Sequence, residues 1–111
     1  MELPDFIKAF PSIDLPLPAD MVTTHVMKTE QGLAVFFDVH KDVELPPHSH
    51  KGQWGTVLVG QVDLTIDGAT RSYHPGETYF IETGTVHAAK VYAGSKVMDI
   101  FEEPDRYSLK T

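Results

Sequence analysis

Short β-type runs separated by turn dipeptides constrain the fold of this chain more than any other feature. The runs are rich in Val, Ile, Thr, Phe and Tyr, the residue types enriched in strands. They cover residues 22–28, 33–40, 54–60, 61–67, 69–74, 77–83, 86–94 and 95–103. Turn signals separate them at Gln31-Gly32, Pro46-Pro47, Asp67-Gly68, Pro75-Gly76, Thr83-Gly84 and Gly94-Ser95. Roughly eight to ten short strands predict an all-β sandwich or barrel.

The chain divides into an N-terminal arm, residues 1–20, and one β-domain, residues 21–111. A length of 111 residues suits a single domain. The arm is extended, with four prolines and one short helical turn expected near residues 5–10. Its apolar side chains need cover: Leu3, Phe6, Ile7, Phe10, Ile13, Leu15 and Leu17. They pack either on the protein's own barrel or on a partner subunit.

Charge and composition exclude several functions. A net charge of −7 argues against binding to nucleic acid or to an anionic membrane surface. The chain has no cysteine, so disulfides and thiolate metal sites are excluded. No signal peptide and no apolar run of about 20 residues is present, which predicts a cytoplasmic protein.

A histidine-rich run carries the chemistry. His48 and His50 are separated by one residue, so an extended strand points both imidazoles to one side. Gln53 follows closely, and His87 begins a later strand. Three imidazoles and an amide oxygen suit one divalent transition metal, which we expect to be Mn, Fe, Co, Ni or Zn. The alternative is that these are structural polar residues of a barrel that holds no metal.

The order of these residues resembles the two motifs of the cupin family. His48, His50 and Gly60 match the first motif, G-x5-H-x-H-x3/4-E-x6-G, and Gly76, Gly84 and His87 match the second, G-x5-P-x-G-x2-H-x3-N. Four positions depart from the motifs: Asp42 and Glu82 replace a Gly and a Pro, Gln53 stands for the Glu, and Val91 stands for the Asn. The resemblance implies a cupin-type double-stranded β-helix, or jelly roll, over about residues 35–103.

A second resemblance concerns the end of the chain. The late Asp, Phe and Arg are similar to pocket residues of the small cupins of pectin breakdown, which linearise unsaturated uronates. The resemblance implies catalytic roles for Asp99, as a proton carrier, and Arg106, as a carboxylate clamp, and places Phe101 in the substrate pocket. Both residues have an alternative: Asp99 is a solvated residue on a strand edge, and Arg106 makes a surface ion pair with Glu102, Glu103 or Asp105. Strand alternation from Phe80 also brings Tyr79 toward the substrate.

Three functions fit these residues. The first is a metal-dependent isomerase or lyase acting on a small polar carbonyl or carboxylate compound, possibly sugar-derived. The second is a non-catalytic module that binds or senses a small metabolite. The third is a metal-dependent dioxygenase. We also expect a homodimer, formed through the arm and an outer sheet face. Trp54 points away from the metal face and serves either in packing or as a dimer contact.

Overall fold

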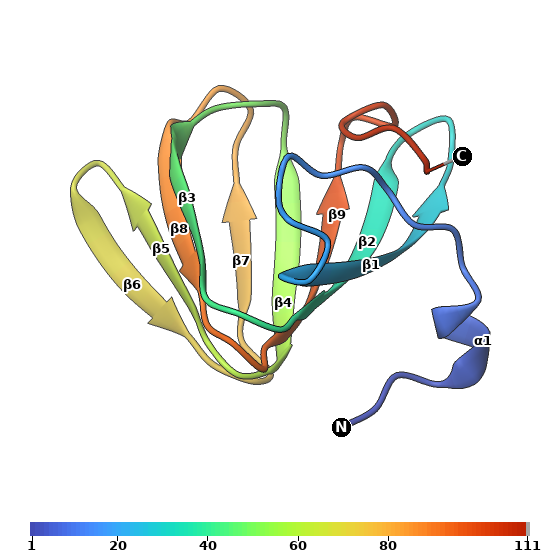
Figure 1. Cartoon of the computed structure of the whole chain (residues 1–111). Helices are drawn as coiled ribbons and strands as arrows, with labels where there is room; N and C mark the ends of the chain where they lie inside the picture. Colours follow the sequence, from blue (N-terminus) through green and yellow to red (C-terminus); the bar gives the residue numbers. More distant parts are fainter. Residues whose placement is uncertain (111) are drawn as a thin grey trace.

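Two antiparallel sheets form the molecule, as seen in a computed structural model that describes residues 1–110. A helical turn, α1, precedes the strands (Figure 1). The elements are α1 (Asp5–Lys8), β1 (Val22–Lys28), β2 (Leu33–Val39), β3 (Val43–His48), β4 (Gln53–Val59), β5 (Val62–Ile66), β6 (Ala69–Tyr73), β7 (Thr78–Ile81), β8 (His87–Val91) and β9 (Lys96–Phe101). The larger sheet has the order β1-β2-β9-β4-β7, and the smaller sheet has the order β3-β8-β5-β6. This architecture confirms the predicted all-β jelly roll.

Alternating side chains build the core between the two sheets. In β9, Val97, Asp99 and Phe101 are buried, whereas Ile100 is exposed. One apolar cluster contains Val57, Leu64 and Ile81, which come from β4, β5 and β7. Because successive residues of a strand face opposite sides, the period-two pattern of the sequence fixes which side chains reach the interior.

The turns follow the expected chemistry, with one exception. Asp67 and Gly68 both have positive φ, +52° and +76°, as a tight hairpin between β5 and β6 requires. The predicted turn at Pro46-Pro47 is wrong, because both prolines lie inside β3. They occupy an irregular stretch where the pairing with β8 shifts between Leu45 and His48. Proline is tolerated there because a bulge leaves ladder hydrogen bonds unmade.

The N-terminal segment packs on its own barrel. Figure 1 shows it (blue) crossing in front of β4 and β9 before it enters β1. Ile13 is only 1% exposed and joins a second core cluster with Val26, Val35 and Phe101. Backbone bonds fix its path, from the Val26 N–H to the Pro11 carbonyl at 2.8 Å among others. Sequence analysis left two arrangements open for the arm, and these contacts correspond to packing on its own subunit.

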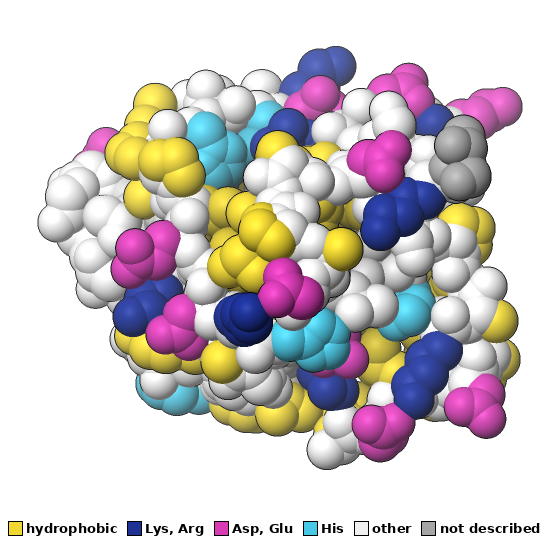
Figure 2. Space-filling view, in the orientation of Figure 1, with side chains coloured by type: hydrophobic (Ala, Val, Ile, Leu, Met, Phe, Trp, Pro, Cys, Tyr) yellow, Lys and Arg dark blue, Asp and Glu magenta, His cyan; other side chains and the backbone are white. Residues whose placement is uncertain are grey.

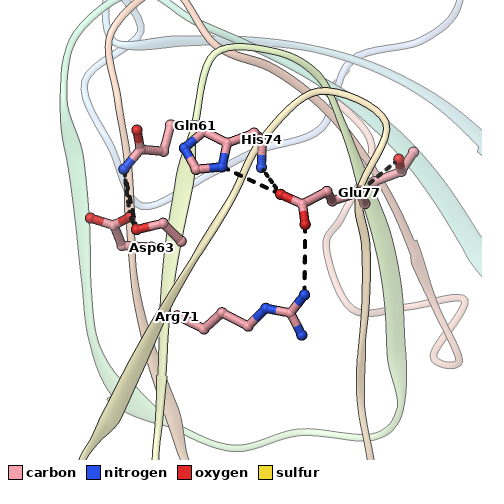
Figure 3. A network of polar contacts seen from close by, with 7 residues as sticks. Gln61, Asp63, Arg71, His74 and Glu77 are labelled. Carbon is pink, nitrogen blue, oxygen red and sulfur yellow. Dashed lines mark hydrogen bonds and ion pairs between the residues drawn. The ribbon is translucent and has the colours of Figure 1, made fainter.

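Figure 3 shows polar contacts around β5 and β6, one group centred on Asp63 and one in which Glu77 pairs with His74 and Arg71. The Asp63 carboxylate accepts hydrogen bonds from Gln61 Nε2 at 2.8 Å and from Ser72 Oγ at 2.6 Å. The Tyr92 hydroxyl is a third donor. These three hydrogen bonds, from Ser72 first, lower the pKa of Asp63. No helix among residues 1–110 is long and apolar enough to cross a membrane.

Candidate metal centre

His48 and His87 lie opposite each other on paired strands. The register shift in β3 makes His48 the pairing partner of His87 in β8. The ring centroids of these two side chains are 4.3 Å apart. The bulge at the two prolines therefore turns the end of β3 so that its last side chain meets the first side chain of β8.

His50 lies in the connection between β3 and β4 rather than on a strand, which corrects the expectation that one extended strand carries both His48 and His50. Hydrogen bonds hold this connection in place. The Gly84 N–H donates to the His50 carbonyl at 2.9 Å, and the Gly52 N–H donates to Thr83 Oγ1 at 3.0 Å. The His50 ring centroid lies 4.8 Å from that of His87 and 5.3 Å from that of His48.

Each of the three imidazoles is oriented by a backbone carbonyl. Nδ1 of His48 lies 2.8 Å from the Pro46 oxygen, Nδ1 of His50 lies 2.7 Å from the Lys51 oxygen, and Nδ1 of His87 lies 2.9 Å from the Thr85 oxygen. A carbonyl only accepts hydrogen bonds, so Nδ1 carries the proton and Nε2 keeps its lone pair. One ligand atom from each ring lies within 4.8 Å of the others. This donor set fits a divalent transition metal, because metal-ligating histidines commonly donate their second nitrogen in this way.

Burial favours the neutral form that metal binding needs. It lowers the pKa of His50 and of His87, and the backbone hydrogen bonds of these rings only partly oppose the effect. The charge of Arg106 acts in the same direction on both rings. Neutral imidazoles at neutral pH leave their nitrogen lone pairs free for a cation.

Asp99 and Tyr79 form a buried pair beside the histidines. The Tyr79 hydroxyl donates to Asp99 Oδ1 at 2.6 Å. Burial raises the pKa of Asp99 to about 6, although hydrogen bonds from Tyr79 and Gln53 oppose the shift. Gln53 also lines the cavity beside Asp99, and its side-chain amide carries an oxygen that can serve as a ligand. The same burial, with the charge of Asp99, raises the pKa of Tyr79, which therefore stays a donor.

Gly55 makes this pair possible. Tyr79, Gly55 and Asp99 are direct neighbours across β7, β4 and β9. A Cβ atom at position 55 would lie 2.5 Å from the Tyr79 hydroxyl oxygen and even closer to Asp99 Oδ1. Sequence analysis did not identify Gly55, because its role depends on strand register rather than on a motif.

A cavity of about 100 Å³ lies between the sheets and ends at these polar groups. His48, His50, Gln53, His87, Tyr79 and Asp99 all line it, together with Phe101. The rest of the wall is almost wholly apolar, and includes Leu15 and Leu17 of the N-terminal segment and Tyr107 of the tail. In Figure 2, histidine side chains (cyan) reach the surface near the upper end of the sheets, where Figure 1 places the β3–β4 connection.

Phe101, predicted to bind substrate, and Arg106, predicted to be catalytic, differ in position. Phe101 is 4% exposed and its ring packs edge-on against His50, with centroids 5.8 Å apart. Arg106 does not line the cavity, and its guanidinium lies over the Tyr107 ring at 4.8 Å. Arg106 makes no ion pair within residues 1–110, and Asp105 pairs with Lys28 instead. The Nε atom of Arg106 is buried and has no hydrogen-bond partner among residues 1–110.

Sequence analysis missed the lining contributed by Leu15, Leu17 and Tyr107. The apolar character of the arm signalled that it needed cover, but no local pattern assigns it to the cavity. Tyr107 lies beyond the last strand, where period-two alternation no longer applies. Its ring packs edge-on against Phe101, with centroids 5.7 Å apart.

Comparisons with known proteins agree with this architecture. The Cupin_2 family, described as the cupin domain, matches residues 35–101. KdgF from Halomonas sp. superposes with a TM-score of 0.69 at 22% identity, over 84% of this chain and 91% of its own. An RmlC-like cupin from Shewanella frigidimarina gives 0.73 at 21% identity, over 89% and 87%.

Bacillus subtilis oxalate decarboxylase, described for its Mn(II) centres, gives a TM-score of 0.65 at 14% identity, over 81% of this chain and 28% of its own. No curated protein sequence matches the chain significantly. At these identities the structural similarity establishes the fold alone.

Proposed function

Because this chain belongs to the cupin domain family, we propose that it binds one divalent transition metal and acts as an isomerase or lyase on a small carbonyl or carboxylate compound. The ligands would be His48, His50, His87 and the oxygen of Gln53. One observation carries the proposal: three backbone carbonyls orient three imidazoles so that each presents an unprotonated Nε2. A structural histidine does not need two like neighbours with the same orientation.

The chain's own groups supply the remaining chemistry. A bound divalent ion would polarise a substrate oxygen as a Lewis acid. Asp99 would accept or return a proton, because its buried carboxyl lies beside the proposed ligand Gln53 and has a pKa near the working range of a general base. The Tyr79 hydroxyl would hold Asp99 in place. Phe101 would form an apolar wall for the substrate, and Arg106 would need to turn from Tyr107 to bind a carboxylate.

The cavity wall narrows the substrate class. Beyond the polar end, the lining residues are aliphatic or aromatic, such as Leu45, Val62 and Val97. An unsaturated uronate carries several hydroxyl groups as well as its carboxylate, and each would lose hydrogen bonds to water on entry without a partner in the wall. The lining favours a compact substrate with oxygens at one end and a short hydrocarbon body. A small 2-oxo acid is a suitable probe of this class.

Metal binding is tested by elemental analysis of protein purified without chelator. We expect about one equivalent of a transition metal in the wild type and a large loss in His87→Ala. His74→Ala is the matched control, because His74 is exposed and pairs with Glu77 away from the cavity (Figure 3). A wild-type protein that takes up no added Mn²⁺, Ni²⁺ or Zn²⁺ would contradict the metal site.

Catalysis is tested with Asp99→Asn. We expect this variant to keep its metal and to lose at least 10²-fold in turnover, the usual contribution of a general base. Turnover would be measured on a panel of small carbonyl and carboxylate compounds. Undiminished turnover in the variant would remove Asp99 from the mechanism. Oxygen uptake during turnover would identify a dioxygenase instead.

A non-catalytic binding module is the second candidate. The Asp99 carboxyl already contacts Tyr79 and Gln53, which suits a structural role in the wall. In that case calorimetry would detect ligand binding to the wild type and to Asp99→Asn alike, and neither protein would convert the ligand to a product.

A further inference from the structure

We propose that Glu103 and Thr83 are positioning residues for His50, because they hold the two peptide groups on either side of Lys51. The inference rests on the proposed metal site, of which His50 is one ligand. The other two histidines lie at strand ends, whereas His50 lies in the connection between β3 and β4. The direction of its ring therefore depends on how this connection is held.

The peptide group that joins His50 to Lys51 is hydrogen-bonded at both ends. Its carbonyl accepts from the Gly84 N–H at 2.9 Å, and its N–H donates to Glu103 Oε1 at 2.9 Å. The partners come from the β7–β8 connection and from the tail after β9, and Figure 1 shows these two segments at the same end of the barrel as the β3–β4 connection. A peptide plane held from two sides cannot turn without breaking a bond.

The next peptide group, which joins Lys51 to Gly52, is held in the same way. Its carbonyl oxygen lies 2.7 Å from Nδ1 of His50, and its N–H donates to Thr83 Oγ1 at 3.0 Å. Because a peptide group is planar and rigid, the hydroxyl that fixes its N–H also fixes its carbonyl. Thr83 thereby fixes the carbonyl oxygen that orients the His50 ring.

Glu103 extends from a backbone that is itself fixed on both sides. Just before it, the Glu102 N–H donates to the Gly52 carbonyl at 2.8 Å. Just after it, the Arg106 N–H donates to the Glu103 carbonyl at 3.2 Å, which closes a turn. Pro104 occupies the second position of this turn, which proline favours, and it restricts the residue before it to extended conformations.

The carboxylate does more than satisfy a donor. Lys51 is exposed, so water could accept its N–H at little cost. A carboxylate forms a stronger, charge-assisted bond and fixes the direction of the donor. Glu103 is half-buried. Burial lowers the pKa of His50, and the negative charge of Glu103 is one of the smaller effects that oppose this, so the carboxylate lies within electrostatic reach of the ring.

Holding His50 in place would strengthen metal binding. A loop ligand that is free to turn loses conformational freedom when a metal binds, and this loss weakens affinity. A ligand that is already oriented loses less. Groups that orient metal ligands usually change metal affinity about 10- to 100-fold when they are removed.

Competition with a chromophoric chelator for Zn²⁺ tests this effect. We expect Glu103→Ala and Thr83→Val to raise the Kd for Zn²⁺ about tenfold each, and Glu103→Gln and Thr83→Ser, which keep an acceptor oxygen, to stay within about threefold of wild type. Asp105→Ala is the matched control, because it removes the same charge from the same tail. The Asp105 carboxylate is 88% exposed and pairs with Lys28 instead.

NMR of the ring nitrogens tests the positioning role without metal. At about pH 8 the rings are neutral, and the wild-type His50 proton should lie on Nδ1. In Glu103→Ala and Thr83→Val this ring should show a mixture of the two tautomers. His48 and His87 should keep theirs, because their rings contact other carbonyls. A general loss of stability would not change one ring alone.

Three results would overturn the proposal. They are unchanged Zn²⁺ affinity and His50 tautomer in Glu103→Ala and Thr83→Val, a loss of affinity in Glu103→Gln as large as in Glu103→Ala, and an equal loss in Asp105→Ala. The last two would mean that charge rather than position controls affinity. A wild-type protein that binds no Zn²⁺ would contradict the metal site itself, whereas the tautomers of the metal-free protein report on the positioning role alone.

Discussion

Gly55 lies between Tyr79 and Asp99 in the register of three neighbouring strands, and its missing Cβ leaves the space through which the phenol reaches the carboxylate. Asp99 and the proposed metal ligand Gln53 line the same cavity, so the proposed proton carrier lies beside the proposed metal site. The geometry of the site therefore depends on a residue that contributes no side chain.

Replacing Gly55 with Ala should destabilise the protein by about 1–3 kcal/mol, the usual cost of inserting atoms into a packed interior. Urea unfolding measures this change. Gly52→Ala is the matched control, because a Cβ there meets only the flexible Glu102 side chain, at 3.4 Å. Equal stability of the two variants would show that Tyr79 and Asp99 can separate without cost.

The sequence predicted which residues form the site better than it predicted how the backbone positions them. His48, His50, Gln53 and His87 were selected by residue type and spacing, and all four line one cavity. His50 reaches it from a loop, so strand alternation was the wrong reason for its position. Arg106 was selected from the resemblance to the small cupins of pectin breakdown. It follows the last strand, where no periodicity constrains the direction of a side chain, and it packs on Tyr107.

At the scale of strands and turns, the sequence was most informative where strand-type runs were joined by a clear turn dipeptide. The hairpin at Asp67-Gly68 was predicted because two positive φ angles favour these residues. The two prolines of β3 were misleading, since proline signals both turns and irregular strand ends. Whether these prolines form a turn or lie in a strand depends on pairing with β8, and β8 is far from them in the sequence.

The hairpin of β5 and β6 carries a testable polar contact. Asp63→Asn removes the charge that strengthens three hydrogen bonds, from Ser72, Tyr92 and Gln61. Because the pKa of Asp63 is lowered in the folded protein, its contribution is present above the unfolded value of 3.8 and is lost as pH falls through the lower folded value. The group is largely exposed, so we expect a loss of at most about 1 kcal/mol at neutral pH.

Thermal or urea unfolding of wild type and Asp63→Asn at neutral and strongly acidic pH would measure this difference. The two proteins should converge in stability at acidic pH. A gap that widens on acidification would mean that the carboxylate is not stabilised by its neighbours.

On the scale of the whole molecule, the N-terminal segment belongs to the barrel. Ile13 is buried in the same cluster as Val26 and Phe101, and Phe101 in turn contacts His50. The apolar composition of the arm indicated that it required cover. Which surface covered it could not be read from the sequence, because the contact joins residues far apart in the chain.

Ile13→Ala should therefore cost about 2–5 kcal/mol, as expected for a large apolar side chain removed from a core. Phe6→Ala is the control, because Phe6 is 68% exposed, and it should change stability by less than about 0.5 kcal/mol. Chemical denaturation would compare them. Similar values for both would mean that the arm is not held in the core in solution.

The beginning and the end of the described chain are joined to each other as well as to the barrel. Ile13 pairs with Leu109 in an isolated β-bridge. Two backbone hydrogen bonds flank this bridge. The Asp14 N–H donates to the Ser108 carbonyl at 2.8 Å, and the Lys110 N–H donates to the Ser12 carbonyl at 2.9 Å. Peeling away residues 108–110 would thus release the stretch that leads directly to Leu15 and Leu17. The tail therefore supports one part of the cavity lining, and loosening the tail would loosen that wall.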